Sequence, residues 1–192
     1  SPTCESPGRR PGLFRESPTP LAPRPGRPPC ALPPLAAAAR AGQNRPMTLM
    51  IRPLEASDEA EWRRLWTGYL EFYETSVAEE VYATSFARML SPEHPAQHGL
   101  IALRDGKPVG LVHYIFHRHN WRVEDVVYMQ DLYVDPEIRG TGAGRALIEA
   151  VYAAGDAAGC PSVYWMTQEF NHSARILYDR IATLTPFIKY QR

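Results

Sequence analysis

The sequence is poor in cysteine and has no long apolar run. Its three cysteines among 192 residues form no Cys-x-x-Cys pair, which argues against a disulfide framework or a structural zinc site and favours a reducing compartment. No stretch of about 18 or more apolar residues occurs, so no membrane-spanning helix is expected. We therefore expect a cytoplasmic protein without a membrane partner.

The first 46 residues have few large apolar side chains. They hold 12 of the 19 prolines, seven arginines, two glutamates and one aromatic residue, Phe14. Such a segment cannot bury enough apolar surface to offset its chain entropy, so we expect residues 1–46 to be a disordered extension without function. An arginine-rich leader also suits an organelle transit peptide, but this one has no amphipathic helical pattern. We expect the folded domain at residues 47–192, with Met47 as its natural start.

The formal net charge of zero is a cancellation between these two parts. Residues 1–46 carry +5, whereas residues 47–192 hold 14 basic and 19 acidic side chains and carry −5. A negative domain attracts cationic molecules and gives no reason to expect nucleic acid as a partner.

The apolar periodicities predict an α/β (α+β) domain, a mixed β-sheet flanked by helices. The residues at 126–134 are strongly apolar, as in the central strand of a sheet that is covered on both faces. A strand, a helix and a further strand in succession indicate a parallel crossover. We expect strands at 47–53, 99–103, 109–116, 126–134, 162–166 and 187–191, and helices at about 58–73, 79–89, 142–158 and 171–181.

The most informative segment joins the strand at 126–134 to the helix that follows it. It reads Arg139-Gly140-Thr141-Gly142-Ala143-Gly144-Arg145. Glycine lets the backbone turn sharply and lets a ligand approach the peptide N–H groups. Those N–H groups open a helix, whose N-terminus favours an anion, and the two arginines can add charge-assisted hydrogen bonds. The segment therefore predicts a pyrophosphate-binding turn.

Two other pyrophosphate-binding patterns fit this turn less well. A P-loop continues with Gly-Lys-Ser/Thr, whereas this chain continues with Gly144-Arg145-Ala146. A dinucleotide-binding fold needs a glycine where Arg145 stands, and it places the motif at the first strand-helix junction.

The turn resembles the acetyl-CoA motif Arg/Gln-x-x-Gly-x-Gly/Ala of the GCN5-related N-acetyltransferases (GNAT), and the likeness covers nearly all of residues 49–192. Within that family the chain is most similar to the fungal histone and small-amine acetyltransferases and their bacterial relatives. The segments that carry this likeness are 66–73, 131–135, 161–165, 171–172 and 177–178.

The resemblance implies an activity as well as a fold. It implies a GNAT-like sheet with a splayed central strand, acetyl-CoA as cosubstrate and a homodimer. It also implies direct transfer of acetyl to a primary amine: a small amine, polyamine or amino acid first, and a protein lysine second. No metal is expected.

The resemblance also implies roles for particular residues. Residues 139–145 would hold the pyrophosphate, and Asn171 would hydrogen-bond the cofactor at the start of the last helix. Tyr178, two helical turns further on, would protonate the coenzyme A thiolate; without the family, an aromatic residue there indicates core packing. The backbone N–H groups that would polarise the thioester at the splay are those of Leu132, Tyr133 and Val134.

The general base stays open. Spermidine/spermine-type relatives have a glutamate where this chain has Gln130, which cannot take a proton. Asp131 is not a simple substitute, since adjacent strand residues point to opposite faces. The remaining alternatives are Asp131, Glu169, Glu124 or a histidine of the preceding strand acting through water, or no base at all if the amine arrives neutral.

Other side chains allow two interpretations each. The aromatic residues of the first helix either pack in the core or line an acceptor pocket; they are Trp66, Tyr69, Phe72 and Tyr73. The strand spacing of His113, His117 and His119 predicts that all three share one face, as ordinary sheet or surface histidines.

Two further functions compete with acetyl transfer. Because Gln130 stands where some relatives have a glutamate, the chain could be a non-catalytic acyl-CoA-binding or regulatory module of the same fold. The presence of both Asn171 and Tyr178 favours an enzyme instead. A nucleotide-dependent dehydrogenase would instead require binding of a nicotinamide cofactor.

Overall fold

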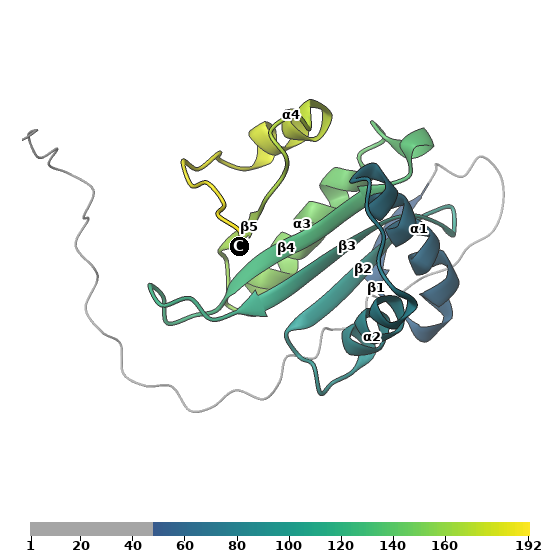
Figure 1. The fold of residues 1–192 in the computed structure, drawn as a ribbon, viewed down its shortest axis with the longest axis horizontal. Coiled ribbons are helices and arrows are strands. Elements are labelled where there is room, and N and C mark those ends of the chain that lie inside the picture. Colours follow the sequence, from purple (N-terminus) through teal and green to yellow (C-terminus); the bar gives the residue numbers. More distant parts are fainter. Residues whose placement is uncertain (1–47) are drawn as a thin grey trace, which may run out of the picture. The chain divides into compact units, whose positions relative to one another are not determined.

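The computed structural model describes residues 48–192, so the predicted extension at 1–46 lies outside the described residues. Five strands form one sheet in chain order. They are β1 (Leu49–Pro53), β2 (Gln97–Arg104), β3 (Lys107–His117), β4 (Val126–Val134) and β5 (Val163–Trp165). Neighbouring strands are antiparallel except β4 and β5, which are parallel, so the mixed sheet is confirmed (Figure 1).

Helices cover both faces of this sheet (Figure 1). They are α1 (Glu59–Phe72), α2 (Glu79–Leu90), α3 (Ala143–Ala157) and α4 (His172–Ile181), with short 3-10 turns η1 (Ala56–Asp58) and η2 (Pro136–Ile138). The helices α1 and α2 lie on one face and α3 lies on the other. The predicted helices are confirmed to within a residue or two at each end.

Each face has its own apolar core, because each helix presents one stripe of large side chains. On the α1 face, Trp62 and Leu65 are fully buried against Ile101 and other side chains of β2 and β3. On the α3 face, Leu147 and Val151 are fully buried against the opposite side of the same strands. The central strands are apolar because both of their faces are covered.

An Asp-Gly hairpin joins β2 to β3. Arg104 pairs with Lys107, so the connection has only two residues. These are Asp105, with φ 51°, and Gly106, with φ 81°. Positive φ at both central positions is the backbone of a type I′ turn, whose twist matches that of the two strands.

The predicted strand at 187–191 is wrong, since residues 182–192 contain no helix or strand. A strand exists only where its backbone pairs with a neighbour, and none of the strand pairings of the described residues includes residues 182–192. Their large apolar side chains are exposed: Leu184, Phe187, Ile188 and Tyr190. The expectation that three histidines share one strand face is also wrong, because β3 ends at His117 and leaves His119 in the following loop.

Within residues 48–192, no helix is long and apolar enough to cross a bilayer.

Candidate active site

A cavity of about 490 Å³ joins the glycine turn, the outer half of β4 and helix α4. It lies where β4 loses one of its neighbours. Strand β5 pairs with β4 only from Val127 to Met129, whereas β3 follows β4 to its end at Val134. The splay of β4 therefore begins at about residue 130. All three residues predicted there line the cavity: Leu132, Tyr133 and Val134.

The glycine turn forms one wall of this cavity. Gly142, with φ 93°, occupies the N-cap position of α3, and Gly140 has φ 81°. An L side chain is strained in this left-handed region, so glycine is needed at both positions. The Thr141 hydroxyl donates to the Ile138 carbonyl at 2.8 Å and holds the turn closed.

The turn fits an anionic pyrophosphate. A Cβ added at Gly140 or Gly142 would meet no heavy atom within 4 Å, so there is open space beside the backbone of the turn. The first N–H groups of α3 have no acceptor within the helix, and the positive end of the helix dipole lies there. The turn residues that line the cavity are Gly140, Gly142, Ala143 and Gly144.

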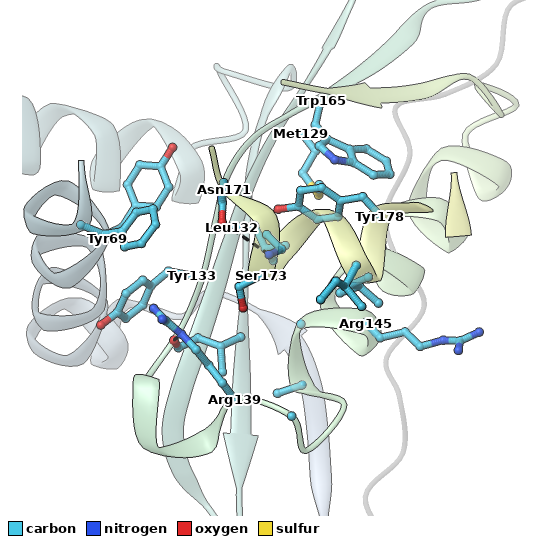
Figure 2. Close-up of a pocket in the computed structure, with 18 of the residues that line it drawn as sticks. Tyr69, Met129, Leu132, Tyr133, Arg139, Arg145, Trp165, Asn171, Ser173 and Tyr178 are labelled. Carbon is cyan, nitrogen blue, oxygen red and sulfur yellow. Dashed lines mark hydrogen bonds between the residues drawn. The ribbon is translucent and has the colours of Figure 1, made fainter. Parts of the chain in front are cut away.

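The two arginines of the turn differ in their surroundings, although both line the cavity. Arg139 donates from Nε to the Val134 carbonyl at 3.3 Å, and its guanidinium lies 5.8 Å from the centre of the Phe72 ring. Arg145 pairs with Glu149 at 2.7 Å. Figure 2 shows Arg145 extending away from Tyr178. Arg139 is therefore the better placed of the two to reach a bound anion.

Helix α4 closes the cavity on the side opposite α1 (Figure 2). Asn171 is its N-cap: its Oδ1 accepts from the Ala174 N–H at 3.4 Å, and its Nδ2 donates to the Thr167 hydroxyl at 3.1 Å. Asn171 and Tyr178 both line the cavity. The seven-residue spacing thus places the two side chains in the same cavity, as the sequence predicted.

Tyr178 has the protonation state that a proton donor needs. Its ring packs edge-on against Trp165, with ring centres 5.3 Å apart. Burial, and then the neighbouring Tyr73, raises the pKa of Tyr178 to about 12. The hydroxyl therefore keeps its proton at neutral pH.

A β-bulge in β4 changes the face on which Asp131 lies. His113 pairs with Asp131 and Tyr114 pairs with Met129, so Gln130 is an extra residue. Regular alternation would place Asp131 on the same face as Met129, in the α3 core. The bulge breaks the alternation and turns Asp131 toward α1. Strict alternation therefore does not hold at this point, although Asp131 still does not line the cavity that Gln130 lines.

Asp131 belongs to a buried hydrogen-bonded chain that the sequence did not reveal. Its Oδ2 lies 2.8 Å from Nδ1 of His113, and Nε2 of His113 accepts from the Trp62 indole N–H at 2.7 Å. Burial raises the pKa of Tyr69, and its hydroxyl also lies close enough to the Asp131 carboxylate for that group to raise this pKa further. His113 and Asp131 are only 8% and 7% exposed. These residues come from α1, β3 and β4, so no local spacing connects them.

The carboxylates considered as general base lie apart from the cavity. Of the described residues, those that line it include Gln130 but not Asp131, Glu169 or Glu124. Asp131 lies behind Tyr69, and Tyr69 lines the cavity. Glu169 is exposed, and its backbone carbonyl accepts from Arg175 at 2.8 Å.

The aromatic stripe of α1 divides between the two roles considered for it. Trp66 is buried in the core, whereas Tyr69, Phe72 and Tyr73 line the cavity. Other lining residues were not singled out in the sequence, because they bear no motif: Met129 and Ser173.

The chain is similar to known acetyltransferases over most of its length. Residues 60–182 match the acetyltransferase (GNAT) family model. The chain is 40% identical over 145 residues to the D-amino-acid N-acetyltransferase HPA3 of Saccharomyces cerevisiae, covering 75% of this chain and 90% of that protein. It is 28% identical over 141 residues to the thialysine N-epsilon-acetyltransferase of Bos taurus, covering 69% and 82%.

Solved structures of the same fold are also similar. The aminoglycoside N-acetyltransferase AAC(6')-Iy, solved in complex with CoA, has a TM-score of 0.67 at 20% identity, covering 77% of this chain and 96% of that one. The ribosomal-protein-alanine N-acetyltransferase of Brucella melitensis has a TM-score of 0.63 at 19% identity, covering 76% and 98%. The chain thus belongs to the GNAT family and is an N-acetyltransferase whose acetyl donor is acetyl-CoA.

Proposed function

We propose that this N-acetyltransferase transfers acetyl directly from acetyl-CoA to a small primary amine within a ternary complex. The observation that carries the proposal is the continuity of the cavity. The same cavity is lined by the glycine turn, the splayed part of β4, Tyr178 and the aromatic residues of α1. A donor bound along the turn and an amine bound at the aromatic end would therefore meet beside Tyr178, without a covalent enzyme intermediate.

The chain's own groups would hold the donor at three places. Arg139 and the N–H groups at Gly140–Gly144 would bind the pyrophosphate, with Arg145 reaching it only after leaving Glu149. The backbone N–H groups of residues 132–134 would bind the acyl arm and polarise the thioester carbonyl. Asn171 would hydrogen-bond the same arm. Bound acetyl-CoA supplies the activated acetyl group and its thiol leaving group.

Tyr178 would serve as the general acid. A hydroxyl that stays protonated up to a pKa of about 12 is present as a donor throughout the neutral range. It would give its proton to the departing thiolate. The general base stays unassigned: Glu169 would have to move into the cavity, and Asp131 would act only through another group.

The acceptor we propose first is a small amine, polyamine or free amino acid, and second a protein lysine. The names of two relatives, a D-amino-acid and a thialysine N-acetyltransferase, support an amino acid. The aromatic ring of Tyr73 suits an ammonium group, which is attracted to π-systems, whereas the Phe72 ring already lies beside the Arg139 guanidinium.

An acceptor panel tests this function. Release of thiol from acetyl-CoA would be measured with D- and L-amino acids, polyamines, aminoglycosides and lysine peptides. We expect release with at least one free amine. Binding of acetyl-CoA without release for any acceptor would contradict the proposal.

We further propose a homodimer. Four large apolar side chains of the last residues are exposed and would be buried by a second copy; they are Leu184, Phe187, Ile188 and Tyr190. The cytoplasmic location that the scarcity of cysteine predicts stays a prediction.

A further inference from the structure

The buried hydrogen-bonded chain Trp62–His113–Asp131 ends beside Tyr69, which lines the cavity. We propose that this chain fixes the Tyr69 hydroxyl as the hydrogen-bond acceptor for the substrate amine, so that Tyr69 contacts the substrate and the other three are positioning residues. The inference rests on the proposed function and names the group that recognises its substrate.

The donor and acceptor of each hydrogen bond in this chain can be deduced from Trp62. An indole N–H can only donate, and it lies 2.7 Å from Nε2 of His113. Nε2 must therefore accept, which leaves the single proton of a neutral imidazole on Nδ1. Nδ1 lies 2.8 Å from Oδ2 of Asp131 and donates to it.

His113 is held neutral by this arrangement. A protonated imidazole would carry an N–H on Nε2, facing the Trp62 N–H, and two donors cannot share a hydrogen bond. Asp131 thus lies 7% exposed with a neutral partner. A buried carboxylate is costly unless further donors compensate its charge. The Tyr69 hydroxyl beside Asp131 is the donor available for this role, so we assign its proton to the Asp131 carboxylate.

The Tyr69 hydroxyl does not lose that proton in the working pH range. Burial, followed by the negative charge of Asp131, raises the pKa of Tyr69 far above its ordinary value. With its proton committed to Asp131, the hydroxyl oxygen offers only lone pairs to the cavity. It can therefore receive a hydrogen bond from an ammonium or amine, whereas a carboxylate would find no donor there.

The surroundings of Tyr69 fit the same kind of ligand. The Tyr69 and Tyr73 rings have centres 5.0 Å apart, and Phe72 lies 5.0 Å from Tyr73. Figure 2 shows Tyr69 on the α1 side of the cavity, with Tyr178 on the α4 side. An amine held by Tyr69 would thus lie across the cavity from the proposed proton donor. A hydrogen bond to the amine would also orient its attack on the acetyl group.

Two substitutions separate this role from simple packing. Tyr69→Phe keeps the ring and removes the oxygen. Asp131→Asn keeps the shape but reverses one hydrogen bond: its carbonyl oxygen must still accept from His113 Nδ1, so its NH₂ group donates to Tyr69. The Tyr69 O–H would then point into the cavity, where it would face the N–H groups of the amine and could no longer accept a hydrogen bond from them.

Tyr82→Phe is the matched control. The Tyr82 hydroxyl bonds the Thr67 hydroxyl at 2.8 Å, and its ring packs against Trp62 and Trp66 in the same aromatic cluster. Tyr82 is not among the residues that line the cavity. The control therefore removes one tyrosine hydroxyl from α2 without touching the proposed amine site.

The experiment measures KM for the acceptor, kcat, and the Kd of acetyl-CoA for the full chain and these variants. For Tyr69→Phe and Asp131→Asn we expect the acceptor KM to rise about tenfold or more, as for a lost hydrogen bond to a charged group. The Kd of acetyl-CoA should stay within about twofold of its original value. Tyr82→Phe should change neither constant.

An unchanged acceptor KM in Tyr69→Phe would overturn this inference while leaving the proposed function intact. An equal loss of affinity for both substrates would also overturn it, because it would indicate a structural role. Tyr69→Phe decides the matter even if Asp131→Asn does not fold. Absence of turnover by the unaltered protein with every amine would overturn both proposals together.

Discussion

Tyr178 and Tyr69 show how one residue type acquires two chemical characters in the same cavity. Both hydroxyls stay protonated because burial raises their pKa values. In our proposal the Tyr69 proton is directed to the neighbouring Asp131, so the Tyr69 oxygen accepts. Tyr178 lies beside an aromatic ring and another tyrosine, so its proton stays available for a substrate. The partner of each hydroxyl, and not the residue type, sets its function.

The raised pKa of Tyr178 can be measured directly. A raised pKa means that the protonated form persists above the ordinary tyrosine pKa of about 10 and is lost only as the pH approaches about 12. We expect the phenolate absorbance of the unaltered protein and of Tyr178→Phe to coincide up to about pH 10.5. A difference with a midpoint near the ordinary tyrosine pKa would show an exposed hydroxyl instead.

At the scale of elements, the strand-turn-helix unit carries donor binding. Gly142 has φ 93° at the N-cap of α3, where alanine is strained by roughly 1–2 kcal/mol. We expect Gly142→Ala to lower the free energy of unfolding by about this amount and to weaken acetyl-CoA binding about tenfold or more. Urea unfolding and calorimetric titration would measure the two effects.

Gly106→Ala is the control for that variant. Gly106 has φ 81° in the β2–β3 hairpin, and an added Cβ would meet nothing within 4 Å, as at Gly142. The strain should be similar, yet Gly106 is not among the cavity-lining residues. Equal acetyl-CoA affinity in the two alanine variants would contradict a binding role for the turn.

The elements that depend on local sequence patterns were predictable from the sequence. The first helix and the glycine turn each follow from a pattern within a few residues, and the resemblance predicted roles for Tyr178 and Asn171, which the structure places in one cavity. The bulge at Gln130 and the His113–Asp131 pair depend on the pairing of β3 with β4, which joins residues 18 positions apart and which no local period records. The strand at 187–191 failed because alternation alone does not supply a pairing partner.

At the scale of the whole molecule, the acidic body and the exposed C-terminal residues bear on its partners. Residues 47–192 carry −5, which favours cationic acceptors. The proposed homodimer predicts a mass of about twice 21.6 kDa in sedimentation equilibrium. Phe187→Ser with Ile188→Ser should shift it toward the monomer. A monomer at all micromolar concentrations would contradict the dimer.

The most direct test of acetyl transfer with Tyr178 as general acid compares the unaltered chain with Tyr178→Phe. Thiol release from acetyl-CoA would be followed with the best acceptor, and acetyl-CoA binding would be titrated for both proteins. We predict a fall in kcat of about 100-fold or more with the Kd of acetyl-CoA nearly unchanged. Full kcat in Tyr178→Phe across the neutral pH range would contradict the assignment.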